Sequence, residues 1–371
     1  MEAGKMLAKF KVRNFKNFRD ELALDLQNIK NYEFNTEAIS NNIIKDAICY
    51  GPNAAGKTSL GYAILDIALH LTDKDRKMDA YTQYCNLNSD EKIVHFEYTF
   101  RFDEDEVQYL YEKTSPLKVL REIVFINGHK VIESEVGREP QISLPGTEQL
   151  NTKLWDGSIS FVKYVAANTS LDGKIKECYL FSRFIDFVNR MLFFSSVNGN
   201  RYIGASNVNG TICGIIAEAN EVKGLQQFLE DMGIHYQLEL GETDDGPNIY
   251  AVFKSSKVLL SKVWSSGTRA LCSLYIWLMK NKSLSFMYLD EFDAFYHYEM
   301  SQAVVEYLKK YPVQVIFTSH NTNLMTNELL RPDCNFELRD NKIIAFSDKT
   351  QKALRKAHNI PKMYKAGAFN E

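Results

Sequence analysis

Long apolar runs are missing from this 371-residue sequence. No segment approaches the roughly 18 uncharged apolar residues that a helix needs to span a bilayer. The opening MEAGKMLAKFKVRNFKNF also lacks the apolar core of a signal peptide. We therefore expect a cytoplasmic protein with no membrane partner.

Cysteine is scarce, and none of the six cysteines belongs to a C-x-x-C pair. This spacing indicates neither a structural zinc site nor a disulfide framework. Sustained heptads, internal repeats and low-complexity tracts are missing as well, which excludes a long coiled coil. The cysteines are Cys49, Cys85, Cys178, Cys213, Cys272 and Cys334.

Charge of one sign is not in excess, because the formal net charge is -3 and both signs are mixed along the chain. Any contact with nucleic acid must then come from a local patch. The tail is locally basic. A solvated helical face is the more common explanation of such a stretch, and contact with nucleic acid or a partner is the alternative. Its cations are Lys349, Lys352, Arg355, Lys356, Lys362 and Lys365.

The first informative stretch is GPNAAGKTS at residues 51–59, which fits the pattern G-x-x-x-x-G-K-[ST]. A short apolar strand is predicted at residues 47–50 and a helix from residue 58, which is the context that a phosphate-binding P-loop requires. We expect Lys57 to reach the β- and γ-phosphates of ATP and Thr58 to ligate Mg²⁺. The alternative is a Gly-rich turn with an incidental lysine. The predicted ATP-binding residues are Gly51, Asn53, Ala54, Ala55, Gly56, Lys57, Thr58 and Ser59.

Two further apolar strands are predicted to end in reactive side chains. Residues 284–291, LSFMYLDE, place Asp290 at a strand tip as a Mg²⁺ ligand, with Glu291 beside it to polarise the attacking water. Residues 313–320, VQVIFTSH, end in His320, which we expect to sense the γ-phosphate and hold that water. The bland alternatives are an acidic helix start and a structural histidine.

A second candidate anion site precedes the helix predicted from residue 270 to residue 278. Ser265, Ser266 and Gly267 offer hydroxyl groups and backbone donors at this helix N-terminus. One ATP does not need two such cradles from one face. The site therefore acts in trans, on the ATP of another copy, or is only a helix cap.

Between these motifs the pattern changes twice. Alternation over residues 94–132, with an Asn127-Gly128 turn, predicts antiparallel strands. Helical spacing follows over residues 171–192, with Met191 on the apolar stripe, and again over residues 225–232.

As a set, these motifs resemble the ATPase head of the ABC superfamily. More narrowly, they look like the OLD-like and RloA-like ATPases, bacterial relatives of RecF and the SMC heads. The resemblance lies in FKVRNFKNF, GPNAAGKTSL, SSGTRAL, YLDEFDAFYH, FTSHNTNLM and the tail MYKAGAF. It covers both ends of the chain well and the middle poorly.

The resemblance implies an α/β fold: an ABC-type P-loop core with a mixed sheet flanked by helices, a β-rich arm and an inserted helical lobe. Residues 1–90 and 251–371 would form the two parts of the core, and residues 91–250 the insertion. The signature departs from that of transporters at Thr268-Arg269. The glutamine that usually follows the first lobe has no assigned position, and Gln83 is only a weak candidate.

The resemblance also implies that two heads pair around ATP, with Glu291 as catalytic base, His320 as switch and Asp293 in the loop linking the sites. Many such proteins serve in anti-phage defence beside a nuclease. We therefore expect an ATPase subunit that gates an effector of nuclease type. The alternative is a RecF-like or SMC-like DNA-binding ATPase of DNA repair or chromosome maintenance.

Overall fold

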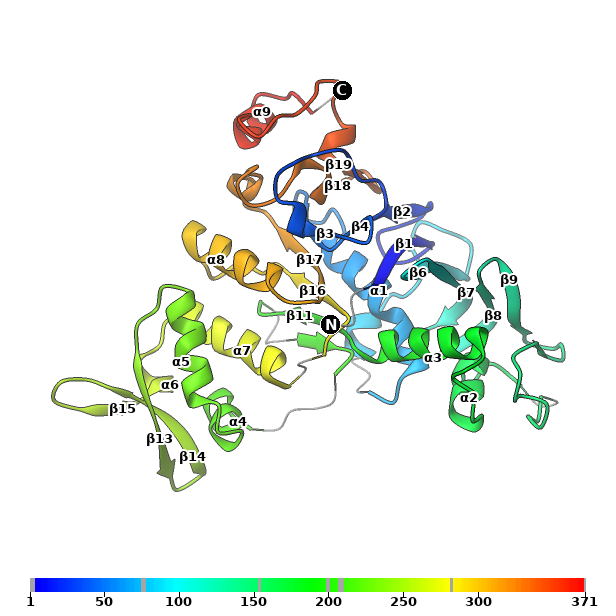
Figure 1. Ribbon diagram of the computed structural model, residues 1–371, viewed down its shortest axis with the longest axis horizontal. Coiled ribbons are helices and arrows are strands. Elements are labelled where there is room, and N and C mark those ends of the chain that lie inside the picture. The colour runs from blue at the N-terminus through cyan, green and yellow to red at the C-terminus, as the bar shows by residue number, and fades with distance from the viewer. Residues whose placement is uncertain are drawn as a thin grey trace.

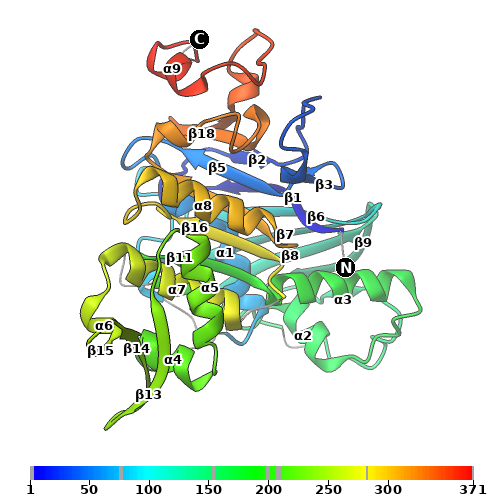
Figure 2. The same ribbon diagram turned by 60° about the vertical axis from the view of Figure 1, so that its left-hand side comes forward.

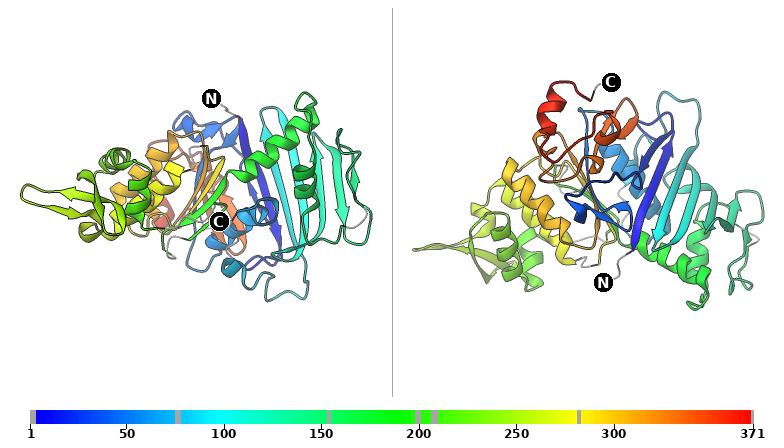
Figure 3. Two further views of the ribbon diagram at one scale, coloured as in Figure 1. Left: turned by 90° about the horizontal axis from the view of Figure 1, so that it is seen from below. Right: turned by 45° about the horizontal axis from the view of Figure 1, so that its top comes forward.

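The computed structural model describes residues 4–74, 78–152, 155–197, 201–205, 210–280 and 283–369. It contains two seven-stranded β-sheets, with helix α1 (Lys57–Leu71) between them (Figure 1). A smaller lobe lies beyond the mainly parallel sheet, on the side away from the antiparallel sheet (Figure 3, left). No helix in these described ranges combines the length and apolarity needed to cross a membrane.

The central sheet collects strands from the two ends and the middle of the chain. Its strands β11, β16, β17, β5 and β18 run parallel, and β5, β16 and β17 are buried along their whole length. Parallel strands that are covered on both faces consist of unbroken apolar runs, which is why the sequence predicted β5, β16 and β17. Across the sheet the order is β12 (Arg201–Ile203), β11 (Met191–Ser195), β16 (Phe286–Asp290), β17 (Gln314–Ser319), β5 (Asp46–Tyr50), β18 (Asn335–Arg339) and β19 (Lys342–Ala345).

The helix predicted over residues 171–192 is shorter than expected. Helix α3 spans Lys176–Asn189, and Met191 already belongs to strand β11, which pairs with β16. A short apolar run after a helix fits a buried strand and a buried helix equally well, so periodicity alone placed Met191 in the wrong element.

The second sheet is antiparallel and joins the N-terminal strands to the β-rich segment. Strand β1 pairs with β2 on one side and with β6 on the other. The Asn127-Gly128 turn lies between β8 and β9, and both residues have positive φ, 49° and 79°, as a tight hairpin turn requires. The order is β10 (Gln141–Ile142), β9 (His129–Glu135), β8 (Lys118–Ile126), β7 (Asp105–Ser115), β6 (Val94–Phe102), β1 (Lys5–Arg13) and β2 (Leu22–Asp25).

This continuity changes how the proposed segments 1–90 and 91–250 relate to each other. The expected boundary falls between β1 and β6, which are neighbours in one sheet, and β11 from the middle segment lies in the central sheet. The β-rich segment is therefore part of the body of the molecule and not a projecting arm. The two strands pair because each satisfies the backbone hydrogen bonds of the other along its edge, and both bury apolar side chains.

Helix α1 is buried at every residue except Thr58. On the side of the antiparallel sheet, Asp66 accepts hydrogen bonds from Lys113 at 2.6 Å, from Tyr111 at 2.9 Å and from Tyr84 at 2.8 Å. Asp66 and Lys113 are fully buried, so each charge depends on the other. On the side of the central sheet, a side chain at Gly61 would meet the ring of Tyr288 at 2.5 Å.

Helices α7 and α8 cover the opposite face of the central sheet, where Leu289 meets Leu274 and Val304 (Figure 2). Alternate residues of β16 thus face α1 and α7, as the pleat of a strand requires. Beyond α7 lies the smaller lobe. Its elements are α4 (Ile212–Glu218), α5 (Val222–Asp231), β13 (Gln237–Thr243), β14 (Gly246–Val252), β15 (Lys257–Leu259) and α6 (Leu260–Val263), and the remaining helices are α2 (Phe161–Asn168), α7 (Ser266–Lys280), α8 (Tyr298–Lys309) and α9 (Ile360–Lys365).

Strand β5, which leads into the P-loop, begins with a buried carboxylate. Asp46 is inaccessible to solvent, and the ammonium of Lys45 lies 3.1 Å away. Burial raises the pKa of Asp46 from its ordinary value of 3.8 to about 7, although Lys45 opposes this shift. The folded protein therefore holds a proton that the unfolded chain releases near pH 4, and it loses this stabilising contribution as the pH rises through about 7.

We predict that Asp46→Asn stabilises the protein relative to wild type more at pH 8 than at pH 5, because asparagine carries no charge to bury. The difference in unfolding free energy should shift by on the order of 1–3 kcal/mol across this range. Thermal melts at both pH values measure it. Asp340→Asn, at an exposed turn, is the control and should show no such trend; a flat difference for Asp46→Asn would contradict the proposed burial penalty.

Candidate nucleotide-binding site

The loop between β5 and α1 has the backbone of a phosphate cradle. Gly56 has φ 103°, and a side chain there would meet the ring of Phe18 at 3.0 Å. Gly51 packs against the carbonyl oxygen of Leu338, which a side chain would approach to 2.4 Å. Ala54 also has positive φ, 62°, which costs energy for a residue other than glycine. The curl of this loop leaves its amide groups at the N-terminus of α1.

The side chain of Lys57 folds back onto the carbonyl oxygens of the loop. Its ammonium group donates to the carbonyl oxygen of Gly51 at 2.8 Å and to that of Pro52 at 3.2 Å, and it lies 3.4 Å from Nδ1 of His320. Partial burial lowers the pKa of Lys57, and neighbouring acidic groups oppose this shift. The side chain therefore sits where the phosphates of a nucleotide would replace loop carbonyls as its partners.

Asp290 ends strand β16 directly beside the start of α1. It accepts a hydrogen bond from the hydroxyl group of Thr58 at 2.9 Å and another from Thr318 at 3.0 Å. Burial raises the pKa of Asp290 to about 6. A hydroxyl and a carboxylate oxygen meeting at a phosphate loop form the ligand pair that P-loop proteins offer to Mg²⁺.

Glu291 follows at the open edge of the sheet, with an unusual backbone. Its φ is 46°, and its amide donates to the hydroxyl group of Thr318 at 2.8 Å. Its carboxylate lies 3.5 Å from Nε2 of His320. Strain of this kind persists only where surrounding contacts hold it, and it is common at active sites. The next acid, Asp293, accepts a hydrogen bond from Ser319 at 2.6 Å, just before the histidine.

Most of these side chains line one pocket of about 270 Å³. Gly51, Asp290 and Asp293 are not among its lining residues, and Asp290 reaches it through its hydrogen bond with Thr58. The sequence did not single out Asn17 as a site residue, although it lies within the quoted FKVRNFKNF stretch. Asn17 accepts a hydrogen bond from Ser59 at 2.6 Å and donates to the carbonyl oxygen of Ala54 at 3.3 Å. The pocket is lined by Asn17, Asn53, Ala54, Ala55, Gly56, Lys57, Thr58, Ser59, Glu291 and His320.

Ser265, Ser266 and Gly267 do not line this pocket. Ser265 accepts a hydrogen bond from the amide of Thr268 at 3.1 Å and so caps α7. Ser266 is exposed, and Gly267 packs so closely on the carbonyl of Phe295 that a side chain would approach it to 2.8 Å. Within one copy of the chain, the second anion site thus stands apart from the first.

The residues present fit ATP with Mg²⁺. Gly56 supplies a backbone that a side chain would block, Lys57 supplies a cation inside the loop, and Thr58 and Asp290 supply hard oxygen ligands. Bound there, Mg²⁺ would neutralise phosphate charge. In the described ranges no group of three or more His, Cys, Asp or Glu side chains offers a metal site of another kind.

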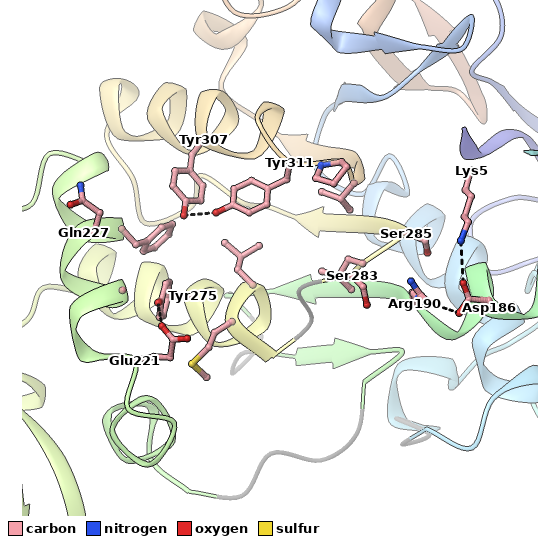
Figure 4. A pocket seen from close by; sticks show the side chains of 17 residues that line it. Lys5, Asp186, Arg190, Glu221, Gln227, Tyr275, Ser283, Ser285, Tyr307 and Tyr311 are labelled. Atoms are coloured by element: carbon pink, nitrogen blue, oxygen red, sulfur yellow. Dashed lines mark hydrogen bonds and ion pairs between the residues drawn. The ribbon is translucent and has the colours of Figure 1, made fainter. Parts of the chain in front are cut away.

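A larger pocket, of about 720 Å³, opens at the opposite edge of the central sheet, where β16 and β17 begin (Figure 4). Tyr275 and Tyr307 line one end, and an ion cluster of Lys5, Asp186 and Arg190 lines the other. It has neither a glycine-rich loop nor a helix N-terminus backed by a lysine. The pocket of about 270 Å³ beside the glycine-rich loop is therefore the candidate nucleotide site, although the other pocket is larger.

Comparisons with known proteins bear on the class of protein. Residues 220–326 match the family described as "AAA domain, putative AbiEii toxin, Type IV TA system". This range contains Ser265–Gly267, Asp290–Glu291 and His320 and leaves out the P-loop. Comparison with curated proteins finds no match.

Among solved structures, the SMC head domain from Thermotoga maritima is 16% identical over 91% of this chain and 98% of that chain, with a TM-score of 0.46. An SMC head bound to the C-terminal winged-helix domain of ScpA is 15% identical over 91% of this chain and 97% of its own, with a TM-score of 0.47. An SMC head with an extended coiled coil, bound to the C-terminal domain of ScpA from Pyrococcus furiosus, is 15% identical over 92% and 96%, also with a TM-score of 0.47. These likenesses concern the fold alone.

The protein is a mixed α/β protein in which a glycine-rich loop of P-loop type joins a buried parallel strand to a helix, and its residues 220–326 are similar to AAA domains.

We predict that Asn17→Ala weakens ATP binding by up to about 10-fold, since it removes two hydrogen bonds that brace the loop. Titration with a fluorescent ATP analogue measures the change. The control Asn28→Ala loses a surface hydrogen bond to Asp348 outside the pocket and should bind normally. Equal affinity for the two variants would show that Asn17 does not support the loop.

Proposed function

We propose that the protein is an ATPase that hydrolyses ATP to ADP and phosphate at this pocket. The observation that carries the proposal is that Lys57, Asp290, Glu291 and His320, which come from three separate parts of the chain, converge on one phosphate loop. Parallel strands β5, β16 and β17 bring their carboxyl ends to one edge, where ligands of α/β sheets bind.

Each side chain then has one role. Lys57 binds the phosphates, and Thr58 and Asp290 hold Mg²⁺. Glu291 takes the proton of the water that attacks the γ-phosphorus while the bond to the bridging oxygen breaks. His320 lies between Lys57 and Glu291, 3.4 Å from the first and 3.5 Å from the second, so it responds to a phosphate that contacts either.

The separation of Ser266 from the pocket supports pairing of two copies. Its hydroxyl is exposed, and the adjacent Phe295 exposes 41% of its surface although it is apolar. We propose that Ser265, Ser266 and Gly267 of one copy complete the phosphate site of another. Each pair of heads would then contain two composite sites.

Mixing two inactive variants tests this pairing. Lys57→Ala and Ser266→Arg should each lose ATP hydrolysis, by about 100-fold or more. In a mixed pair both changes fall in the same composite site, and the other site is intact, so the mixture should regain a substantial part of the wild-type rate. Two portions of Lys57→Ala mixed together serve as the control. A mixture as inactive as its components would contradict sites shared between copies.

We further propose that the ATP state gates an associated effector, of nuclease type, in anti-phage defence. The support is the motif set noted in the sequence together with a matched family described by a toxin of a toxin–antitoxin system. The described residues contain no cluster of three or more His, Cys, Asp or Glu side chains of the kind that metal-dependent nucleases use, so the nuclease would be a separate partner. Repair or chromosome maintenance, with DNA as the direct target, is the second reading.

A pull-down of tagged Glu291→Gln protein from its native host separates the two readings. Loss of the base should leave ATP bound and unhydrolysed and so hold the paired state. We expect a stoichiometric protein partner that survives nuclease treatment. The control is Lys57→Ala, which should not retain ATP and should recover less partner. Material that disappears with nuclease treatment would favour the DNA-maintenance reading instead.

A further inference from the structure

The C-terminal segment of residues 349–369 concentrates positive charge on a chain whose net charge is -3. It contains six Lys or Arg residues and no Asp or Glu. Lys349 is paired with the buried carboxylate of Glu337. The other five cations are exposed, and within the described ranges none of them forms an ion pair. They are Lys352, Arg355, Lys356, Lys362 and Lys365.

This basic segment, residues 352–365, is fixed to the body of the protein. The side chain of Asn327, which is buried, donates to the carbonyl oxygens of Arg355 at 2.9 Å, His358 at 3.3 Å and Lys356 at 3.4 Å. Further on, the ring of Phe369 packs against Phe346 at 5.1 Å. Five like charges thus lie along one fixed segment, and no described residue forms an ion pair with them, an arrangement that a polyanion would stabilise.

The anchor of the basic segment is the stretch of chain that follows His320. Lys365 donates to the side chain of Asn323 at 3.0 Å, and α9 packs on the short helix Thr322–Leu324 that contains it. Asn327 belongs to the same stretch. Figure 1 shows α9 beyond β18 and β19 at the end of the molecule away from the smaller lobe. A ligand that moves the basic segment therefore also acts on the loop that positions His320.

The composition of the segment favours nucleic acid over an acidic protein. Between residues 349 and 369 no large apolar side chain is exposed, whereas the centre of a protein interface is apolar and aromatic. Binding of a phosphate backbone needs only cations. Residues 349–369 contain no exposed aromatic ring for base stacking, which single strands use, so the partner that fits this segment is a duplex.

We propose that residues 352–365 bind the phosphate backbone of double-stranded nucleic acid, and that this contact acts through the loop after His320 on ATP turnover. The second half rests on the proposed ATPase function, whereas the binding surface does not. Duplex nucleic acid is then an input to the ATP site, independent of whatever effector forms the output.

The binding test uses the full-length Glu291→Gln protein with ATP and a short fluorescent DNA duplex, measured by anisotropy at several salt concentrations. The test variant combines Lys352→Gln, Arg355→Gln, Lys356→Gln and Lys362→Gln. We expect it to bind about 10-fold or more weakly, with a salt dependence whose logarithmic slope falls by up to about 4.

The matched control removes the same charge elsewhere through Lys118→Gln, Lys174→Gln, Lys223→Gln and Lys254→Gln, all at exposed positions. It should bind the duplex as tightly as the parent protein. Equal losses in the two variants, or no binding of the duplex by the parent protein, would each overturn the proposal.

The coupling test measures ATP hydrolysis by otherwise wild-type protein with and without the duplex. The rate should rise several-fold with the duplex, and the quadruple variant should keep its basal rate without this rise. Duplex binding with an unchanged rate would overturn the coupling alone. Duplex binding by a protein that hydrolyses no ATP would overturn the proposed function and the coupling, and would leave the binding surface standing.

Discussion

The burial of helix α1 between two sheets is the constraint on which the rest of the structure depends. Tyr288 holds one face of this helix, and Asp66, paired with Lys113, holds the other. A helix fixed on both sides cannot shift when charge arrives at its N-terminus, so the loop that it carries stays in shape. Preorganisation of this kind is what makes electrostatic catalysis effective, because nothing needs to rearrange during the reaction.

The sheet edge that carries the proposed ATP site contains strained backbone and a buried charge, both of which this rigid frame supports. Glu291 and Ala54 adopt left-handed backbone conformations, and Asp290 is a buried carboxylate whose pKa is raised to about 6. The hydroxyl group of Thr318 donates a hydrogen bond to Asp290 and accepts one from the amide of Glu291. One threonine on β17 therefore positions both acids at the end of β16. The adjacent strands are therefore part of the site as well as its scaffold.

The loop after His320 connects this edge to the outside of the protein. It begins directly after His320, which lies close to Lys57 and Glu291, and it carries Asn323 and Asn327, which hold the basic C-terminal segment. A site that responds to phosphate and a surface suited to a polyanion thus share one short stretch of chain. This sharing gives a physical route by which an external ligand could alter the ATP site without touching it.

The sequence by itself determined the elements whose signals are local. The buried strands that precede Gly51, end at Asp290 and precede His320 are unbroken apolar runs. The hairpin turn is specified by its two residues, Asn127 and Gly128. The features that the sequence did not predict depend on pairing between segments that are distant along the chain. Met191 begins a strand of the central sheet, β6 joins β1 across the expected boundary at residue 90, and Asn17 reaches the P-loop from a turn near the N-terminus. Only the tertiary structure settles such pairings, because a strand's partner depends on which edge and face remain to be buried and not on its own residues.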